Sequence, residues 1–593
     1  MDKKSFAIGI TLLALALLWP FIVISIWKPQ PSPQSTSPQL PHTQSTGQQP
    51  PAIPVFQTPS APDVAEIQTR LFQDTPTVAS LENDLIKIDF SPIGAGIRSI
   101  TLKTHESENG ARVILNESGS SAIMAFSGWD DGSKNTANIR AQKNENAVRF
   151  TYTTPDGLEI TKTYRLYTGR KTYRSVATVL IYNPLDRTIT IPQFLINVGT
   201  SGPIHRLDMP YHIGFDYVSP GGVHHKKITD FRAGFFGMRP ARSVIEENLP
   251  LSWLTSRNQY FLCFLRSDNG VFRGYRALDV KLPPWQDGTR PDGVQVFAKM
   301  PLTTLAPGDS ITWNFDLYTG PREYDQLKAL GERAQLIMEY GWFGLVSVLL
   351  GWLMTTYHGW LGSYGLAIIL MVLTVRAILW PLQNKANKTM KAMQALAPKM
   401  KEVQEKYKDD PQKMNEEIMA LYSEYGVNPL GGCLPILVQI PVFFGFYAML
   451  QSAVQLRYES FLWVRDLSQP DTIFTIPGLE LPINLLPILM GATSLWQMSV
   501  TPMTTTDKFQ TTLFKLMPFI FVVICYNFSS ALALYWTVQN LVGVAQLYYN
   551  LGKPAPKLEK RPRNRPKTRW QLMMEQARVL AEEERKKKLA RKK

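Results

Sequence analysis

The sequence predicts an α-helical polytopic membrane protein with six spans, five of them forming a core, and a large extracytoplasmic antiparallel β-sandwich domain. Three observations predict this fold class. Six apolar segments reach or approach the length that crosses a bilayer. Residues 63–340 instead form short runs in which apolar and polar residues alternate. Lysine and arginine collect in one long loop and in the carboxyl-terminal tail, as expected of cytoplasmic segments.

Composition limits the classes of function. A chain of 593 residues is too long for a single hydrophobic core, so we expect several domains. The net charge of +15 indicates an anionic partner such as lipid or nucleic acid. Cys263, Cys433 and Cys525 lie far apart, and the 7 histidines form no metal-ligand pattern. The sequence therefore predicts no metal site, no cofactor and no redox centre.

The first apolar segment, residues 6–27, follows Lys3 and Lys4 and is long enough for a span. A cleaved signal peptide is the alternative, but the apolar core is too long and no small-x-small site follows it. We therefore expect an uncleaved signal anchor over 1–28, with its amino terminus in the cytoplasm. Residues 29–62 contain ten prolines and no acidic residue, which predicts a disordered or extended linker.

Residues 63–340 are predicted to form the β-sandwich. Runs such as "DLIKIDF", "LEITKTYRLYT" and "TITIPQFLINV" alternate apolar and polar residues between turns rich in Asn, Gly, Pro and Asp. Many such strands with little helical periodicity are typical of a large antiparallel sandwich. A helical stretch at 323–340 should then lead back to the membrane.

The remaining chain is predicted to be mostly helical. Residues 341–360 should form an interfacial helix, which the sequence Tyr357-His358-Gly359 interrupts. The core at 361–550 should contain five spans, at about 361–382, 431–451, 484–500, 512–528 and 530–549.

A cytoplasmic helical hairpin is expected at 384–426, with Asp410-Pro411 opening its second helix. Methionines recur along the apolar stripe of this hairpin, which suits either self-packing or an adaptable surface for apolar clients.

The distribution of charge predicts the orientation. The loop between the second and third spans contains eight lysines, and the tail at 551–593 contains sixteen Lys or Arg and five Glu. Both termini should therefore be cytoplasmic and the β domain extracytoplasmic. Because the charge of the tail continues far beyond the last span, anionic lipids and ribosomal RNA are the expected partners.

Arg376 lies in the apolar run "VLTVRAILWPL", where a charge costs about 2.5–3.5 kcal/mol on insertion scales. One interpretation is snorkelling, in which the guanidinium reaches the cytoplasmic interface. However, helical Cα–Cβ bonds tilt toward the helix amino terminus, here the outer side, which directs the side chain deeper. The other interpretation is a polar, partly hydrated cavity between helices. The residues alone leave both interpretations open.

Polar residues of other spans are candidates to line such a cavity. Gln439 lies in "LPILVQIPVFF", and Gln539 and Asn540 lie in "YWTVQNLVG". Each alone would more commonly be a hydrogen-bonding group between helices. Together with a cation that lacks an acidic partner in the spans, they favour a cavity that attracts a carboxylate from another molecule.

The helical half resembles a known family. The stretches "VNPLGGCLPILVQIPVF", "LPILMGATSLWQMSVTP", "KLMPFIFVVICYNFSSALALYW" and "VQNLVGVAQLYYN" are similar to the core of YidC-type membrane-protein insertases, across about 342–550. The anchor, linker and β domain have the layout of the Gram-negative inner-membrane form. The resemblance implies insertion, folding and assembly of inner-membrane proteins, alone or with the Sec translocon, and no enzyme activity.

The resemblance also implies a hydrophilic groove that is open to the cytoplasm and to lipid. The expected groove residues are Arg376, Gln439, Gln539, Asn540 and Trp536. Clients would slide along the third span and the last hairpin, past Cys433, Pro435, Ile440, Pro441, Phe444, Phe514, Phe519 and Tyr535. The implied partners are nascent membrane proteins, the Sec translocon, the ribosome and anionic lipids. The outer domain would resemble a mutarotase-like supersandwich.

Two other classes of function are weighed against this one. A solute transporter or channel would use Arg376 as an anion site, but the spans show no internal symmetry. A carbohydrate-active enzyme would need paired acid and base residues in the β domain. Acidic residues such as Glu159, Glu246 and Asp279 form no such motif.

Overall fold

The computed structural model describes residues 72, 75–130, 139–167, 171–234, 240–285, 287–428, 434–478, 481–501 and 508–554, and the single residues 560, 573 and 576. The predicted anchor, the linker and most of the tail lie outside the described residues. The chain divides into two compact units. The β unit comprises 37–342 together with 451–458, and the helical unit comprises 1–36, 343–450 and 459–593.

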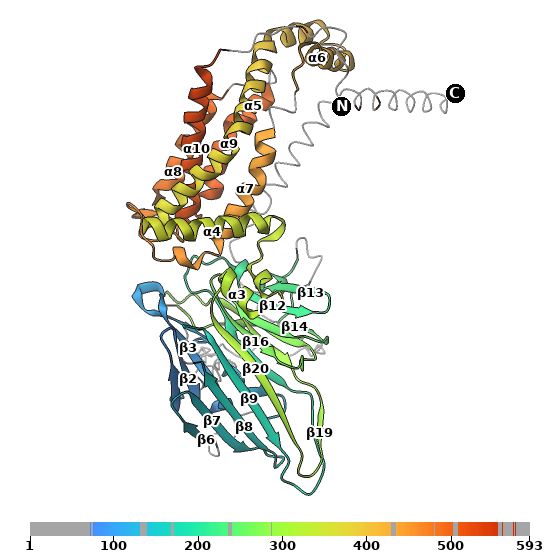
Figure 1. Ribbon diagram of the computed structural model, residues 1–593, viewed down its shortest axis with the longest axis vertical. Helices are drawn as coiled ribbons and strands as arrows, with labels where there is room; N and C mark the ends of the chain where they lie inside the picture. Colours follow the sequence, from blue (N-terminus) through green and yellow to red (C-terminus); the bar gives the residue numbers. More distant parts are fainter. Residues whose placement is uncertain are drawn as a thin grey trace, which may run out of the picture. The chain divides into compact units, whose positions relative to one another are not determined.

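The β unit is built on a nine-stranded antiparallel sheet (Figure 1). Its order is β13 (Gly222–Lys227), β12 (Gly214–Ser219), β15 (Trp253–Arg257), β16 (Phe261–Ser267), β20 (Ser310–Pro321), β9 (Arg174–Tyr182), β8 (Glu159–Leu166), β7 (Ala147–Thr153) and β6 (Arg140–Lys143).

Smaller antiparallel sheets complete the β unit. A five-stranded sheet has the order β14 (Val244–Glu247), β17 (Tyr275–Lys281), β18 (Asp292–Lys299), β11 (Leu195–Ser201) and β5 (Phe126–Ser127). A four-stranded sheet contains β1 (Ala79–Glu82), β2 (Ile86–Ser91), β3 (Gly96–Glu106) and β4 (Arg112–Leu115), and β10 (Ile189–Ile191) pairs with β19 (Thr303–Leu305).

The alternating pattern of the sequence produces the core between these sheets. In β7, Val148, Phe150 and Tyr152 are buried, while the residues between them are exposed. The rings of Phe90, from the four-stranded sheet, and Phe150, from the nine-stranded sheet, have centroids 6.0 Å apart. Apolar faces of separate sheets therefore pack against each other. The predicted antiparallel β-sandwich is confirmed.

The predicted helical stretch at 323–340 is only partly helical. Helix α3 (Tyr324–Leu330) ends at Gly331, whose φ of +78° is a left-handed conformation that glycine adopts at no steric cost. A short 3-10 helix, Ala334–Met338, follows. The predicted helical stretch is therefore present but broken at Gly331.

A buried charge cluster fixes the end of this segment to the large sheet. Arg257 Nε donates to Asp216 Oδ2 at 2.7 Å, and Arg257 Nη2 donates to Glu339 Oε2 at 2.9 Å. Lys227 Nζ lies 3.1 Å from Glu339 Oε1. Burial alone would raise the pKa of the Glu339 carboxyl, but Arg257 and Lys227 outweigh burial and hold that pKa below its ordinary value of 4.5.

The β unit also includes a segment that is distant in sequence. Gln451 Oε1 accepts hydrogen bonds from the Tyr211 hydroxyl at 3.3 Å and the His212 Nε2 at 3.1 Å. The backbone carbonyl of Gln451 accepts from Gln259 Nε2 at 2.8 Å. No pattern in the sequence indicates that residues 451–458 belong to this unit.

The helical unit contains seven described helices and a small hairpin (Figure 1). They are α4 (Gly344–Leu361), α5 (Tyr364–Lys406), α6 (Pro411–Tyr425), α7 (Leu434–Gln451), α8 (Leu485–Val500), α9 (Lys508–Cys525) and α10 (Ser530–Leu551), with β21 (Thr472–Ile476) and β22 (Leu481–Asn484). The strand pair between α7 and α8 was not predicted.

Two predicted helix boundaries are wrong. Helix α4 continues through Tyr357-His358-Gly359 to Leu361, and Gly362, with φ +65°, caps it. Helix α5 continues past residue 382 to Lys406, so the second predicted span and the first helix of the hairpin form one helix. Pro381 lies inside α5, and the long run of helix-forming residues after it outweighs the hydrogen bond that proline removes.

The second helix of the predicted hairpin begins where its sequence predicts. Asp410 caps α6, since its side chain accepts from the backbone N–H of Lys413 at 3.1 Å. The two arms pack through a cluster that includes Met393, Met400 and Tyr422.

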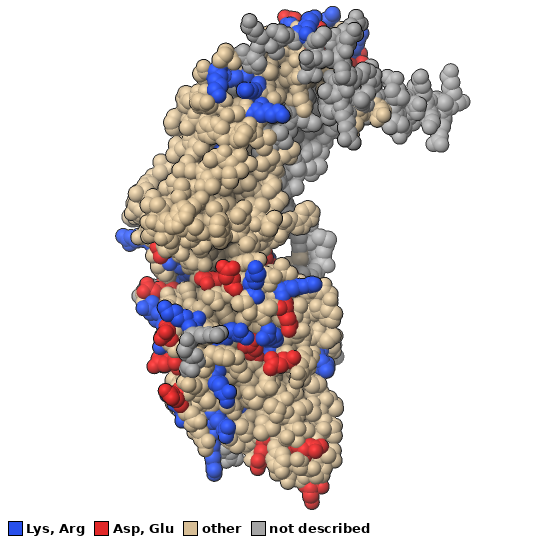
Figure 2. Space-filling view, viewed as in Figure 1, with Lys and Arg blue, Asp and Glu red and all other residues tan. Residues whose placement is uncertain are grey.

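The helical unit carries a wide band without charge. On the face seen in Figure 2, its middle displays almost no Lys, Arg, Asp or Glu, while basic side chains gather at the end where α5 passes into α6. Of the described helices, α5 alone is long and apolar enough to cross a membrane. Within the described residues, shorter apolar stretches lie in α7, α8 and α9, at Leu437–Gln451, Leu485–Val500 and Leu516–Cys525. The count of six spans is not confirmed.

The charge cluster around Glu339 predicts a pH dependence of stability. Because the folded-state pKa of Glu339 is lowered, its contribution to stability is present above pH 4.5 and is lost as the pH falls below that value. Glu339→Gln should therefore flatten the acid side of the stability profile of the β unit. Calorimetric melting of the full chain in nanodiscs checks this.

The matched control for this experiment is Glu82→Gln. Glu82 forms an exposed pair with Lys103, at 2.8 Å between Oε2 and Nζ, and such pairs contribute little. Equal acid sensitivity of Glu339→Gln and the unmodified chain would contradict the assignment.

Candidate functional site

The side chain of Arg376, on α5, faces α10 and forms hydrogen bonds with neutral groups there. Its Nε donates to Gln539 Oε1 at 2.9 Å, and its Nη2 donates to the Gln539 backbone carbonyl at 3.0 Å. Among the described residues, no salt bridge brings a carboxylate within 4.0 Å of the guanidinium. The cation is therefore solvated by amide dipoles of the protein and retains its full charge for another partner.

A glycine on α10 makes room for this contact. A Cβ at Gly543 would lie 3.4 Å from Arg376 Nη2 and only 2.7 Å from Gln497 Nε2. Both polar side chains therefore meet α10 at the position where it lacks a side chain. Gln497 comes from α8, and Gly543 was not among the predicted site residues.

More amide side chains continue the polar surface from Arg376. A small cavity of about 10 Å³, at the lower limit for one water molecule, is lined by Arg376, Leu379, Leu382, Gln383, Val438, Gln439 and Gln546. Sequence reasoning missed Gln383 and Gln546. The signal was present, because Gln383 follows Arg376 by seven residues and Gln546 follows Gln539 by seven, which places each pair on one helix face.

Lys391 fixes the two helices that carry this surface. Its Nζ donates to the Asn550 carbonyl and, at 2.9 Å, to the Lys553 carbonyl, at the carboxyl end of α10. The Asn550 carbonyl also accepts from the Lys553 backbone N–H at 3.0 Å, so the lysine from α5 adds a further donor and a favourable charge at this helix end. Asn384 Oδ1 accepts from Asn550 Nδ2 at 2.9 Å in the same region.

Gln439 of α7 connects the polar surface to a buried tyrosine. Its Nε2 donates to the Tyr535 hydroxyl at 3.3 Å. Tyr535 is only 2% exposed, and its ring stacks on Phe446 at a centroid distance of 4.1 Å. Tyr535 therefore lies in the interior of the bundle, and its hydroxyl accepts the hydrogen bond that orients the Gln439 side chain.

Asn540 has partners on a different helix. It is 4% exposed, and its Nδ2 donates to Ser494 Oγ at 2.7 Å, Thr493 Oγ1 at 3.1 Å and the Met490 carbonyl at 3.3 Å. These bonds join α10 to α8, as expected of a polar group between membrane helices. Arg376, by contrast, bonds to the neighbouring Gln539.

Trp536, which was expected in the groove, belongs to an aromatic cluster of α7, α9 and α10. Trp536 packs against Phe443 at 4.9 Å and Phe521 at 4.6 Å between ring centroids. Phe519 of α9 is 56% exposed. Ile440, Pro441 and Phe444 of α7 are half-buried. Cys433 and the side chains of Pro435 and Phe514 lie outside the described residues.

Within the described ranges, no group of three or more His, Cys, Asp or Glu side chains is arranged to hold a metal ion. The chemistry of this site is therefore that of one cation among neutral amides and apolar side chains.

Comparisons with known proteins cover both units. The family described as "60Kd inner membrane protein" matches residues 356–554, and the "YidC periplasmic domain" matches residues 79–353. A membrane protein insertase YidC from Geobacter sp. (strain M21) is 30% identical over 79% of this chain and 84% of its own length. The chain belongs to the YidC membrane protein insertase family.

A second relative agrees with this assignment. The insertase YidC of Marinobacter nauticus is 33% identical over 69% of this chain and 67% of its own length. A crystal structure described as an active YidC insertase with the first transmembrane domain resolved is 19% identical, with a TM-score of 0.33, over 82% of this chain and 97% of that one. The insertase names of these YidC relatives do not support the transporter interpretation.

The contacts of Asn540 predict a structural role that can be separated from Arg376. Asn540→Leu, which has a similar volume, should lower the unfolding free energy by about 1 kcal/mol, because hydrogen bonds to α8 are lost. Gln439→Leu should cost less, since it removes one bond of 3.3 Å. Thermal unfolding in detergent, followed by labelling of the buried Cys525 thiol, measures both. Equal midpoints for Asn540→Leu and the unmodified chain would contradict this role.

Proposed function

We propose that this chain inserts newly made proteins into the inner membrane and assists their folding and assembly. Membership of the insertase family supports this proposal. The observation that carries it is the Arg376 guanidinium, held at 2.9 Å and 3.0 Å by Gln539 and without a carboxylate within 4.0 Å among the described residues. Such a cation is a docking point for an acidic polar segment that enters from the cytoplasm.

The first step of the proposed mechanism is capture of a client's polar tail. An acidic tail gains attraction from Arg376, and the amides of Gln383, Gln439 and Gln546 offer hydrogen bonds to its backbone. Together these groups would form the hydrophilic groove, open to the cytoplasm and lipid. Asn540 would support the groove through α8 rather than bind the client.

Short apolar helices lower the barrier to crossing. Helix α7, Leu434–Gln451, is 18 residues long, or about 27 Å at 1.5 Å per residue, against a hydrocarbon core of about 30 Å. We propose that the bilayer is thinner beside α7 and α9, so that the polar tail crosses less hydrocarbon. The membrane potential adds about 2.3 kcal/mol per negative charge for each 100 mV.

The apolar segment of the client would then slide into lipid past α7 and α9. Large apolar side chains are exposed there: Leu437, Leu516, Phe519 and Val523 are 59%, 52%, 56% and 74% exposed. Ile440, Pro441, Phe444 and Trp536 would complete the path. The driving force for movement of the client into lipid is the burial of its apolar surface, about 25 cal/mol per Å².

The arrangement in the membrane belongs to the same proposal. We propose six spans, cytoplasmic termini and a periplasmic β domain of the supersandwich type, because the lysine-rich loop and the tail share one side. The Sec translocon, the ribosome and anionic lipids are proposed partners, the last two through the tail and the cytoplasmic hairpin.

Insertion in vesicles tests the role of Arg376. Arg376→Gln should slow insertion of a single-span client with an acidic tail by about tenfold, equivalent to about 1.4 kcal/mol of lost charge attraction. A client with a neutral tail should lose less. Arg376→Lys should fall between, because lysine keeps the charge and loses the paired donors.

Lys401→Gln is the matched control for that experiment, since it removes an exposed cation from the same helix, 71% exposed and far from Gln539 in sequence. If the Arg376→Gln variant inserts both clients at the rate of the unmodified chain, the Arg376 charge is not a docking point.

Removal of residues 555–593 tests the ribosome contact. Co-sedimentation with ribosomes at low salt should fall when the tail is removed and should weaken steeply as salt rises, since bound cations release counterions from RNA. A tail of the same composition in scrambled order should retain the binding. Undiminished co-sedimentation without the tail would contradict this part of the proposal.

A further inference from the structure

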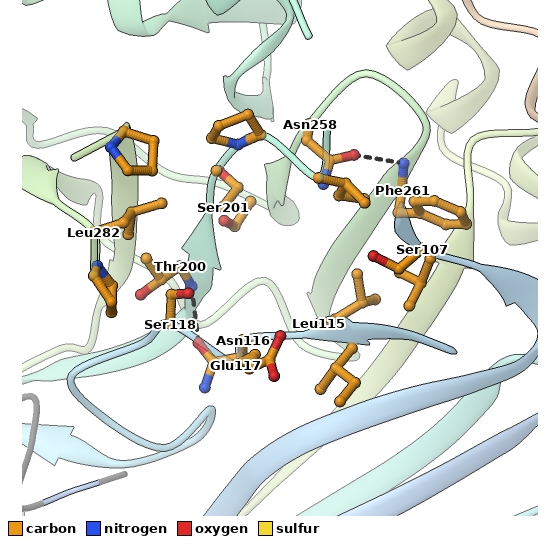
Figure 3. A pocket seen from close by; sticks show the side chains of 18 of the residues that line it. Ser107, Leu115, Asn116, Glu117, Ser118, Thr200, Ser201, Asn258, Phe261 and Leu282 are labelled. Carbon is orange, nitrogen blue, oxygen red and sulfur yellow. Dashed lines mark hydrogen bonds between the residues drawn. The ribbon is translucent and has the colours of Figure 1, made fainter. Parts of the chain in front are cut away.

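A cavity far larger than the one beside Arg376 lies inside the β unit. It has a volume of about 310 Å³, at the lower end of the range for small-molecule sites. Its walls come from three sheets, at the end of β4, along β11 and along β15 and β16, and from the loop between β17 and β18. Figure 3 shows side chains from these elements around an open space, with Leu282 on one side and Phe261 on the other.

The walls of the cavity are fixed by hydrogen bonds to the backbone. Asn116 Oδ1 accepts from the Thr200 N–H at 3.0 Å, and Asn258 Oδ1 accepts from the Phe261 N–H at 2.9 Å (Figure 3). Asn116 Nδ2 also donates to the Arg98 carbonyl at 2.9 Å. A cavity with such walls keeps its shape without a ligand and loses little entropy when one binds.

Two hydroxyl groups in the walls lack protein partners. The Oγ of Ser256 and the Oγ1 of Thr200 are buried and hydrogen-bond to no described protein atom. Ser256 is 2% exposed. Its strand neighbours Thr255 and Arg257 both bond to Asp216 on the other face of β15, so strand alternation turns Ser256 toward the cavity.

Buried polar groups without partners are rare, and each calls for a ligand or water to satisfy it. The hydroxyls of Ser256 and Thr200 can each donate and accept one or more hydrogen bonds. A ligand rich in hydroxyl groups can both donate hydrogen bonds to these side chains and accept hydrogen bonds from them. A carbonyl oxygen can only accept.

The charge of the walls narrows the class of ligand. Of the described residues that line the cavity, Glu117 alone is ionisable as an acid, and none is Lys, Arg or His. This composition disfavours phosphate, sulfate and carboxylate ligands. Burial raises the pKa of the Glu117 carboxyl above its ordinary value. Trp285 adds an aromatic ring to the walls, with the Arg206 guanidinium 5.7 Å from its centroid, and the C–H face of a sugar ring can pack against such a ring.

We propose that this cavity binds a neutral polyhydroxylated ligand of about the size of one or two sugar rings, with Ser256 and Thr200 as its hydrogen-bonding partners. The ligand is bound and not converted, because glycoside hydrolysis requires two carboxyl groups and the described walls contain one. The acidic residues Glu159, Glu246 and Asp279 do not line the cavity.

Saturation-transfer NMR with the full chain tests the proposal. The chain is placed in lipid nanodiscs free of glycoside detergents, whose sugar headgroups would compete. D-glucose, N-acetylglucosamine and a trimer of N-acetylglucosamine are the probes, and a neutral Ala-Ser-Ala peptide tests the other class of occupant. The ring protons of at least one sugar should receive saturation, and the peptide should not displace it.

Substitutions connect this binding to the cavity. Ser256→Ala and Thr200→Val should each weaken sugar binding by about fivefold, the effect of one lost hydrogen bond. Ser310→Ala, at an exposed serine of β20 outside the cavity, is the matched control and should bind as the unmodified chain does. Thermal unfolding of the same preparations reports that each variant is folded.

The relative affinities of the probes distinguish two sources of the ligand. Tighter binding of the trimer than of the monomer identifies the end of a glycan strand as the ligand source, and equal binding identifies a free sugar. Absence of saturation transfer to all three sugars, unchanged affinity in both cavity variants, or binding of the peptide alone would overturn the proposal.

Discussion

The structure of the helical unit depends on one electrostatic constraint, the solvation of the Arg376 cation away from bulk water. An isolated charge in a low-dielectric environment is costly unless dipoles or an opposite charge compensate it. Here the compensation comes from Gln539, which provides both its side-chain and its backbone oxygen at 2.9 Å and 3.0 Å. Neutral dipoles lower the cost without cancelling the charge, so the cation remains attractive to an incoming carboxylate.

Much of the neighbouring structure serves this arrangement. Gly543 leaves space for the guanidinium against α10, and Lys391 holds the end of α10 to α5. Asn540 connects α10 to α8 from the other side, and Tyr535 supports Gln439. The polar residues of the bundle therefore divide into those that face Arg376 and those that hold the helices which carry it.

The sequence predicted the class of the fold because its signals are local. The alternation of apolar and polar residues predicted the strands of the β unit, as in β7, and long apolar runs predicted the helices. It could not predict which polar residues face Arg376, since Gln539 and Asn540 are adjacent in sequence but point to different helices. It also missed the continuity of α5 through Pro381 and the place of residues 451–458 in the β unit, because tertiary packing decides both.

The central claim is that client carboxylates visit the surface around Arg376, and a photo-crosslinker at Gln546 tests this most directly. Gln546 lines the small cavity with Arg376 but forms no bond with it. With a client arrested during insertion, the account predicts adducts with the acidic tail that diminish when Arg376 is replaced by glutamine. Adducts with lipid alone, or client adducts that are unchanged by that replacement, would contradict it.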